Sequence, residues 1–229
     1  MGMAAAAGTR SELLWVVLQI YSSAPHPGSQ VFPSPAKPED AIKGRGLRGW
    51  GSGLADDLSQ PAAAAAAFGW LRAAQARLAF RRIGEADLAF LARLYASTRM
   101  EELAVTGWRA EQKAAFLQMQ FDAQHAHYQK HYVGSDFLVI ERDGAGVGRL
   151  YLARWKREHR IVDIAMLPQY RGQGLGTALL RDLLDEAAAA GKAVSIHVEK
   201  FNPAQSLYRR LGFVPAGEEG AYDLMRRSP

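Results

Sequence analysis

Residues 169–176 read QYRGQGLG, a glycine-rich turn between two segments of opposite character. Before this turn, residues 161–167 form a dense apolar run, which predicts a buried strand that ends at Pro168. After it, leucines recur at helical spacing between Leu175 and Ala187, and Gly191 supplies a stop signal. A strand, a glycine-rich loop and a helix N-terminus make an anion site, because backbone N–H groups and the helix dipole favour a phosphate.

The loop lacks the two common nucleotide signatures. The Gly-Lys-Ser/Thr ending of a Walker loop is missing. Thr177 stands where the third glycine of the dinucleotide fingerprint should fall. Arg171 adds a bidentate donor for a phosphate inside the loop. From these residues alone, both a pyrophosphate site and a simple tight turn between strand and helix remain open.

The rest of the chain from residue 78 onwards predicts a mixed sheet flanked by helices. Residues with strand-like patterns lie at 78–83, 137–141, 147–153, 161–167, 194–198, 213–215 and 222–225. Residues with helical spacing lie at 85–97, 109–130, 175–187 and 202–211. The resulting order, β-α-α-β-β-β-α-β-α-β-β, predicts an α/β (α+β) fold with a mixed sheet flanked by helices.

A second motif lies downstream of the glycine loop. It runs Asn202-Pro203-Ala204-x-x-Leu207-Tyr208-x-x-x-Gly212-Phe213. Together with Gln169-x-x-Gly172-x-Gly174 after Leu167-Pro168, it resembles the two signatures of the GNAT N-acetyltransferase superfamily. The gap between the motifs fits one helix and one strand, and the resemblance covers residues 78–229. It implies a GNAT domain there, using acetyl-CoA as cosubstrate and no metal.

The resemblance also implies roles for individual residues. The coenzyme A pyrophosphate would be held by the backbone amides of Arg171, Gly172, Gln173, Gly174 and Gly176 and by the Thr177 hydroxyl. The pantetheine arm would pair with the strand end at Ala165, Met166 and Leu167, in a strand that carries a bulge in this superfamily. Asn202 would contact the pantetheine or cap the following helix, and Tyr208 would protonate the departing thiolate.

The chemistry of acetyl transfer also fits the residues themselves. The chain has no cysteine, so the acetyl group passes directly to the amine or uses another nucleophile. A tyrosine O–H is a suitable acid for a thiolate, because both groups hold their protons up to high pH. Asp163 lies between Val162 and Ile164 and is the first candidate for the general base. The open alternatives are a water chain, Glu158, His159 and Glu199.

The acceptor side is expected on the helix that covers residues 118–132, because early helices shape the acceptor pocket in this superfamily. Gln120, Gln124 and His127 fall near one helical stripe, together with Tyr128 or His131, and Gln120, Gln124 and Tyr128 are the expected substrate-binding residues. This stripe either faces the acceptor or belongs to a solvated helix. His127 and His131 stand four residues apart, but no carboxylate completes a known metal spacing.

Residues 1–77 differ in composition from the rest of the chain. Prolines, glycines and an alanine run crowd residues 22–67, which predicts a low-complexity, poorly ordered extension. Residues 68–77 could form a short helix with Trp70, Leu71 and Ala74 on one side. The apolar run from Leu13 to Tyr21 is too short to span a bilayer and is a weak signal-peptide core, so a cytoplasmic location is the default expectation.

Charge narrows the expected partners. The net charge of +5 is spread thinly and leaves no basic stripe of the kind nucleic-acid binding needs. The family resemblance implies that the acceptor is an amine of a small molecule or peptide, which receives the acetyl group in a ternary complex. We expect neither nucleic-acid nor membrane partners, and a homodimer is compatible with the sequence. The alternative function is a non-catalytic module that binds acyl-CoA.

Overall fold

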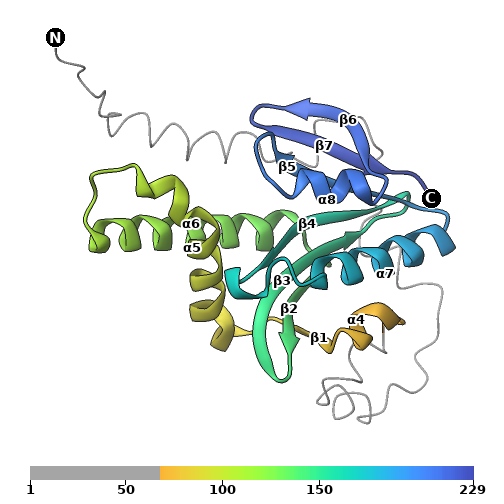
Figure 1. Cartoon of the computed structure of the whole chain (residues 1–229), viewed down its shortest axis with the longest axis horizontal. Helices are drawn as coiled ribbons and strands as arrows, with labels where there is room; N and C mark the ends of the chain where they lie inside the picture. Colours follow the sequence, from red (N-terminus) through yellow and green to blue (C-terminus); the bar gives the residue numbers. More distant parts are fainter. Residues whose placement is uncertain (1–67) are drawn as a thin grey trace.

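A computed structural model of the chain describes residues 68–229. Seven strands form one sheet in the order β1-β2-β3-β4-β5-β7-β6 (Figure 1). The strands are β1 (Leu78–Arg82), β2 (Asp136–Arg142), β3 (Ala145–Arg154), β4 (Glu158–Met166), β5 (Ala193–Glu199), β6 (Val214–Glu219) and β7 (Tyr222–Arg227). The main helices are α4 (Leu71–Gln75), α5 (Leu88–Ala104), α6 (Ala110–His131), α7 (Leu175–Ala189) and α8 (Gln205–Arg210).

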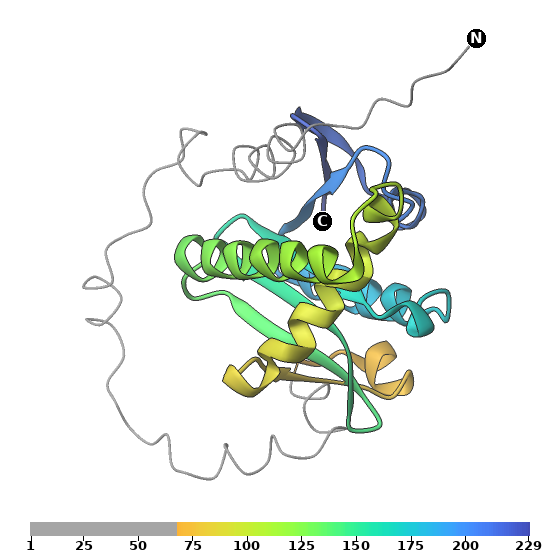
Figure 2. The same cartoon turned by 90° about the vertical axis from the view of Figure 1, so that its left-hand side faces the viewer.

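Helices cover both faces of the sheet. Figure 2 shows α5 and α6 crossing in front of the strands, with α7 on the opposite face. The leucines of α7, among them Leu179 and Leu183, are fully buried against sheet residues such as Leu150. On the other face, a smaller cluster that includes Leu91 and Phe121 joins α5 to α6. The helical leucine spacing of residues 175–187 therefore forms the main core, as its period requires.

The element order predicted from the sequence is confirmed, while some boundaries differ. The first long helix is preceded by a 3₁₀ turn over Glu85–Asp87 and continues to Ala104. The strand expected at 161–167 begins earlier, at Glu158. Its polar first residues escape the apolar pattern because backbone pairing with β3 and β5 sets the strand, and their side chains find ionic partners, such as Arg160 for Glu158.

Residues 68–77 pack onto the sheet and α7. Trp70 is 1% exposed and its ring contacts those of Phe68 and Phe80. The Ala73 N–H donates to Asp182 on α7 at 2.7 Å. Trp70 and Ala73 are the buried residues of this segment and Leu71 is exposed, so Leu71 does not share one side with Trp70 as expected. The Leu13–Tyr21 run and the rest of 1–67 lie outside the described residues.

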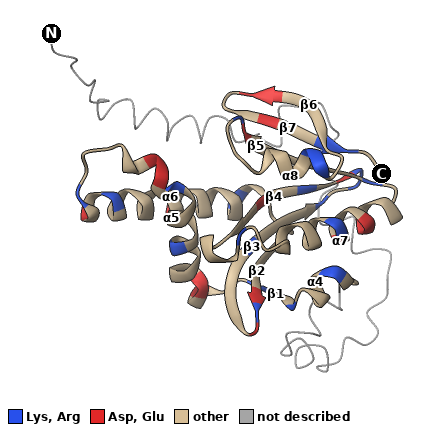
Figure 3. Ribbon diagram, in the orientation of Figure 1, with Lys and Arg blue, Asp and Glu red and all other residues tan. Residues whose placement is uncertain are grey.

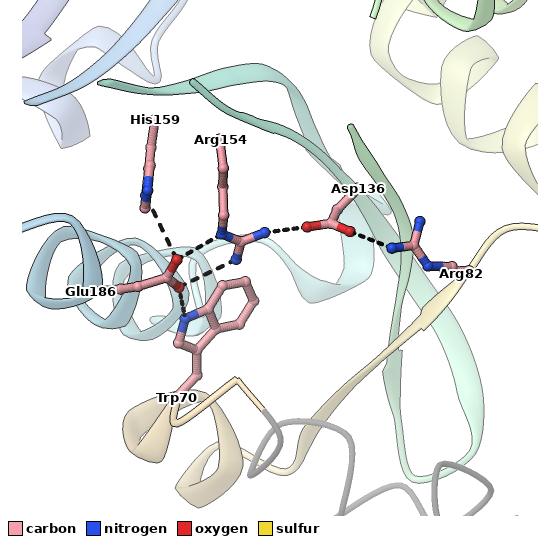
Figure 4. Close-up of polar contacts among 6 residues, drawn as sticks. All are labelled: Trp70, Arg82, Asp136, Arg154, His159 and Glu186. Atoms are coloured by element: carbon pink, nitrogen blue, oxygen red, sulfur yellow. Dashed lines mark hydrogen bonds and ion pairs between the residues drawn. The ribbon is translucent and has the colours of Figure 1, made fainter. Parts of the chain in front are cut away.

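A chain of polar contacts connects this segment to three strands (Figure 4). The Trp70 indole N–H donates to Glu186 at 2.8 Å, and Arg154 donates to the same carboxylate at 2.7 Å. Arg154 also pairs with Asp136, which in turn accepts from Arg82 at 2.8 Å. The contacts therefore tie α4 and α7 to β3, β2 and β1.

No helix within residues 68–229 is long and apolar enough to cross a membrane.

Candidate active site

The centre of the sheet contains an opening between β4 and β5. These two strands pair in parallel only from Glu158↔Ala193 to Ile161↔Ile196. Beyond that point β4 stays paired with β3 and β5 with β7, but β4 and β5 no longer pair with each other. The edge of β4 that faces β5 therefore has main-chain polar groups over 162–166 that no strand pairs with. Apart from Met166 O, which accepts from Arg171, these groups could bond to an added extended chain.

A β-bulge lies where the two strands part. Opposite β3, Tyr151 pairs with Asp163 and Leu152 pairs with Ile161, so Val162 is the extra residue. A bulge bends its strand and increases the local twist, which turns the end of β4 away from β5. The bulge expected from the family resemblance is therefore present, and it is located at the mouth of the opening.

The glycine loop closes one end of this opening. Gly172 and Gly174 have φ values of +71° and +79°, a conformation that glycine adopts without strain. The Arg171 N–H donates to Pro168 O at 3.1 Å, whereas the N–H groups from Gly172 to Thr177 donate to no other group among residues 68–229. They cluster at the N-terminus of the 15-residue helix α7, which has no acidic residue in its first turn. The loop can therefore hold an anion.

Hydrogen bonds from side chains hold the glycine loop in place. The Arg171 Nε donates to Met166 O at 2.8 Å, which links the loop to the end of β4. The Gln173 side chain donates to Gln169 O at 2.6 Å and accepts from Arg142 at 2.8 Å. These contacts fix the loop while its backbone amides stay exposed to solvent.

Tyr208 lies on α8 near the same opening. The side chain is buried and its ring contacts Phe213 at a centroid distance of 5.6 Å. Burial, and secondarily the charge of Asp163, raise the pKa of Tyr208 well above its ordinary value. Its hydroxyl makes no hydrogen bond with any other described residue. Asn202, the other motif residue, accepts from the Ala204 N–H at 2.9 Å and so caps the turn that leads into α8.

Asp163 is held in an ion pair. Arg149 on β3 donates to both of its oxygens, at 3.1 Å from Nε and 2.7 Å from an outer nitrogen. Arg149 is itself buried, and it also donates to Gln124 at 3.0 Å. Burial opposes the charge of Arg149, but the Asp163 carboxylate outweighs this effect and raises the arginine pKa. The pair and Gln124 form one polar network under α6.

The stripe on α6 faces the protein interior. Gln120 is buried and accepts from the Tyr95 hydroxyl at 3.2 Å, and Gln124 contacts Arg149 as described. The Tyr128 ring packs edge-on against Tyr151 at 5.9 Å. Of the two readings left open by the sequence, the solvated helix is therefore excluded for these three residues. They lie on the same face of the sheet as Asp163.

The other candidate bases occupy different places. His159 is buried on the α7 face, where its Nδ1 lies 3.7 Å from Glu186 (Figure 4). Glu199 borders the opening at the end of β5 and pairs with Arg99 of α5 at 2.6 Å. Arg99 also binds Glu102 at 2.8 Å and is a site residue that the sequence did not reveal. A contact between residues 99 and 199 carries no spacing signal, so only the fold could show it.

The described part of the chain contains no group of three or more side chains suited to hold a metal ion. His127 and His131 do lie close together, with ring centroids 4.4 Å apart. That pair has no third ligand from His, Asp or Glu within residues 68–229.

Comparisons with known proteins point to one family. Residues 133–215 match the model of the Acetyltransferase (GNAT) domain. A Bacillus subtilis protein named as a [ribosomal protein bS18]-alanine N-acetyltransferase is 34% identical over 110 residues, covering 46% of this chain and 65% of that protein. N-alpha-acetyltransferase RimI of Mycobacterium tuberculosis is 35% identical over 107 residues, covering 44% and 63%.

A third relative acts on a different kind of molecule. Streptothricin acetyltransferase of Streptomyces lavendulae is 34% identical over 89 residues, covering 37% of this chain and 47% of that protein. The chain thus spans less than two thirds of the length of each of these three relatives.

Solved structures share the fold. The PaiA N-acetyltransferase of Thermoplasma acidophilum, solved with coenzyme A, aligns with a TM-score of 0.51 at 16% identity. The alignment covers 66% of this chain and 99% of that one. PH1933 of Pyrococcus horikoshii aligns with a TM-score of 0.50 at 19% identity, covering 66% and 98%.

Proposed function

We propose that this chain, which carries an acetyltransferase (GNAT) domain, moves an acetyl group from acetyl-CoA directly to an amine in a ternary complex. The observation that supports this most strongly is the opening between β4 and β5. It combines a strand edge over 162–166 that pairs with no other strand with a group of backbone N–H donors at the start of α7 that have no acceptor within residues 68–229. An extended arm that ends in a diphosphate fits this pair of features better than a compact nucleotide does.

We infer the following contacts for the coenzyme. The diphosphate binds the N–H groups of Gly172, Gln173, Gly174 and Gly176 with the Thr177 hydroxyl, and Arg171 adds positive charge beside them. The pantetheine arm lies along Ala165, Met166 and Leu167. Asn202, which already caps the approach to α8, lines the other side of the arm. Bound in this way, the coenzyme supplies an activated acetyl thioester at the bulge.

The reaction then needs one proton acceptor and one proton donor. The amine nitrogen forms a bond to the acetyl carbonyl carbon as the carbon–sulfur bond breaks, and the amine loses a proton while the thiolate gains one. Tyr208 gives its phenolic proton to the sulfur. Its raised pKa supports this role, because the phenol is fully protonated at neutral pH. Asp163 receives the amine proton, directly or through an intervening water, and the two hydrogen bonds from Arg149 hold its carboxylate in place.

The acceptor enters from the α5/α6 side. Gln120, Gln124 and Tyr128 lie on that face of the sheet, and we assign them to the wall of the acceptor site. Two of the relatives are named for acetylation of N-terminal or α-amino groups and one for an antibiotic. These names favour an exposed primary amine on a peptide or small molecule as the acceptor.

Release of free thiol tests the proposal directly. The purified chain is mixed with acetyl-CoA and a panel of peptides and small amines, and the thiol is followed with a chromogenic disulfide. Acetyl-CoA binding is measured in parallel by calorimetry. We expect binding together with amine-dependent thiol release. Binding without turnover on any amine would instead identify a non-catalytic acyl-CoA module, and absence of binding would refute the assignment.

A further inference from the structure

Three side chains form a row across the strands beside the opening. Tyr222 on β7 pairs directly with Glu199 on β5 and with Glu219 on β6. Directly paired residues point to the same face of a sheet. Arg99 of α5 contacts Glu199, so the row faces α5 and α6, the side from which we infer that the acceptor enters. The row therefore brings two carboxylates and one phenol to the rim of the acceptor site.

His197 lies on β5 two residues before Glu199, at the point where β4 and β5 separate. It follows Ile196, the last residue of β5 that pairs with β4. Its Nδ1 is 2.6 Å from a guanidinium nitrogen of Arg160. Arginine can only donate, so Nδ1 must accept and the ring proton must sit on Nε2. Nε2 points toward Glu219, at 3.7 Å from its carboxylate oxygen.

The imidazole is neutral at physiological pH. Burial, together with the positive charge of Arg160, lowers the pKa of His197 to about 4. The contact with Glu219 is therefore between a carboxylate and an uncharged N–H. At 3.7 Å, beyond hydrogen-bond length, the N–H attracts the carboxylate without neutralising it.

Acidic residues lie on both β6 and β7 (Figure 3). Asp223, which follows Tyr222 and so points to the opposite face, accepts from Gln205 at 2.9 Å, while the charged side chains near Glu219 on its own face form ion pairs. Arg149 forms an ion pair with Asp163, and Arg99 forms ion pairs with Glu102 and Glu199. Arg160 and Arg226 both pair with Glu158. Within residues 68–229, Glu219 makes no ion pair with a lysine or arginine. Its side chain is 38% exposed and lies next to Tyr222. Burial, and to a smaller extent the charge of Glu219, raise the pKa of the buried Tyr132. A partly exposed carboxylate beside a phenol ring is a suitable partner for an organic cation.

We propose that Glu219 selects acceptors that carry a second cationic centre beside the reacting amine, and that His197 is a positioning residue that aims Glu219 at that centre. The inference rests on the proposed acetyl transfer and specifies its substrate class. The shared chemistry is a diamine or a basic residue next to the reacting amine. A neutral acceptor of the same length gains nothing from Glu219, and an anionic acceptor is repelled.

Three acceptors of matched length test this inference. They are 1,5-diaminopentane, n-pentylamine and 5-aminopentanoate, which carry a cation, no charge and an anion at the far end. For the wild-type protein, kcat/KM should fall in that order. Glu219→Gln should lower kcat/KM for the diamine about fivefold, the effect of losing one partly exposed charge pair, and should leave pentylamine unchanged. Glu219→Asp should retain part of the preference.

Glu218→Gln provides the matched control. Glu218 neighbours Glu219 but pairs with Lys200 at 2.7 Å, and alternate residues of a strand point to opposite faces. This variant should keep the wild-type preference. His197→Phe should raise KM for the diamine without changing kcat, and should not affect pentylamine, a split that general loss of stability would not produce.

The outcomes separate the two proposals. Equal kcat/KM for the three acceptors, or an equal loss on all three in Glu219→Gln, would overturn the selective role of Glu219. Acetyl-CoA binding without acetylation of the diamine would overturn it as well. Failure to bind acetyl-CoA at all would instead refute the proposed function on which the inference rests.

Discussion

At the scale of single residues, the polar groups around the opening differ in whether they already have partners. Asp163 is held by Arg149 and Glu199 by Arg99, whereas the Tyr208 ring is held by its packing on Phe213 and its hydroxyl donates to none of the residues 68–229. The two carboxylates therefore have fixed positions beside the opening, and the Tyr208 hydroxyl keeps its proton available for a ligand.

The role of Tyr208 leads to a clear separation of effects. Tyr208→Phe should lower kcat by about 10²- to 10⁴-fold, the usual contribution of a general acid. It should leave the affinity for acetyl-CoA and the thermal unfolding midpoint nearly unchanged, because the ring stays packed on Phe213. Single-turnover kinetics and calorimetry together measure this. A variant that retains wild-type kcat would remove Tyr208 from the mechanism.

His197 makes stability depend on pH in a defined window. Its folded pKa of about 4 lies below the ordinary value of ~6.5, so the folded state binds fewer protons than the unfolded chain between these values. Acidification through this window should therefore cost wild-type stability that is fully present above it. Urea unfolding at pH 7.5 and pH 4.5 should show a smaller loss for His197→Gln. An identical loss in both proteins would contradict a neutral, partly buried imidazole.

The sequence could identify some site residues but could not show how they are paired. The motifs place Gly172, Gly174 and Tyr208 without any structure, because the spacing itself requires a loop and a helix. The sequence pattern also singles out Asp163 as a charged residue in an apolar strand. Its partner Arg149 lies on another strand, and Glu219 and His197 meet across β7. Such pairings depend on strand register, which residue spacing alone does not determine.

At the scale of elements, the divergence of β4 from β5 is the feature that matters most. β4 is held from its other side by β3, where Gly148 approaches so closely that an added Cβ would lie 2.4 Å from Ala165 O. The contacting atom belongs to the backbone, so β4 would have to move. The position of Ala165–Leu167, the inferred bed of the pantetheine arm, is therefore set by a glycine on the neighbouring strand.

This close approach predicts the effect of one methyl group. Gly148→Ala should weaken acetyl-CoA binding about tenfold or more, since displaced backbone in the arm's bed loses its hydrogen bonds. Gly146→Ala on the same strand is a control, because its added Cβ would meet only the Phe90 ring, at 3.2 Å. Calorimetry on both variants measures this. Equal affinities for the two variants would refute the inferred place of the arm.

The order of elements was predictable, and the opening between two of them was not. Periodicity gave the strands and helices because each buries one face. The early end of the β4–β5 pairing depends on the bulge at Val162. The first three residues of β4 are polar, so the apolar pattern did not identify them as part of the strand. The family resemblance, but not the residue pattern, anticipated that a bulge would be there.

At the scale of the whole molecule, residues 68–77 belong to the packed structure. Trp70 fills a place between α7 and β1, and Asp182 and Glu186 each bind this segment. The sequence suggested a boundary at residue 78 because compositional change is visible there, whereas the α7 residues that bind this segment, Asp182 and Glu186, lie more than a hundred residues away. We propose that the acetyltransferase unit comprises residues 78–229 with this segment docked against it.

Two truncations test the docked segment. Removal of residues 1–77 should cost about 3–5 kcal/mol, comparable to the loss of one buried tryptophan. In a domain of this size, that corresponds to a fall in melting temperature of roughly 6–20 °C. Removal of 1–67 is the matched control and should give a clearly higher melting temperature by circular dichroism. Equal melting temperatures would show that the segment contributes no stability.

The most direct measurement is a crystal structure with acetyl-CoA bound. The account predicts the diphosphate within hydrogen-bond distance of the amides between Gly172 and Thr177. It also predicts the pantetheine arm along Ala165–Leu167 and the sulfur beside the Tyr208 hydroxyl. A coenzyme bound outside the opening between β4 and β5, or a sulfur remote from that hydroxyl, would contradict it.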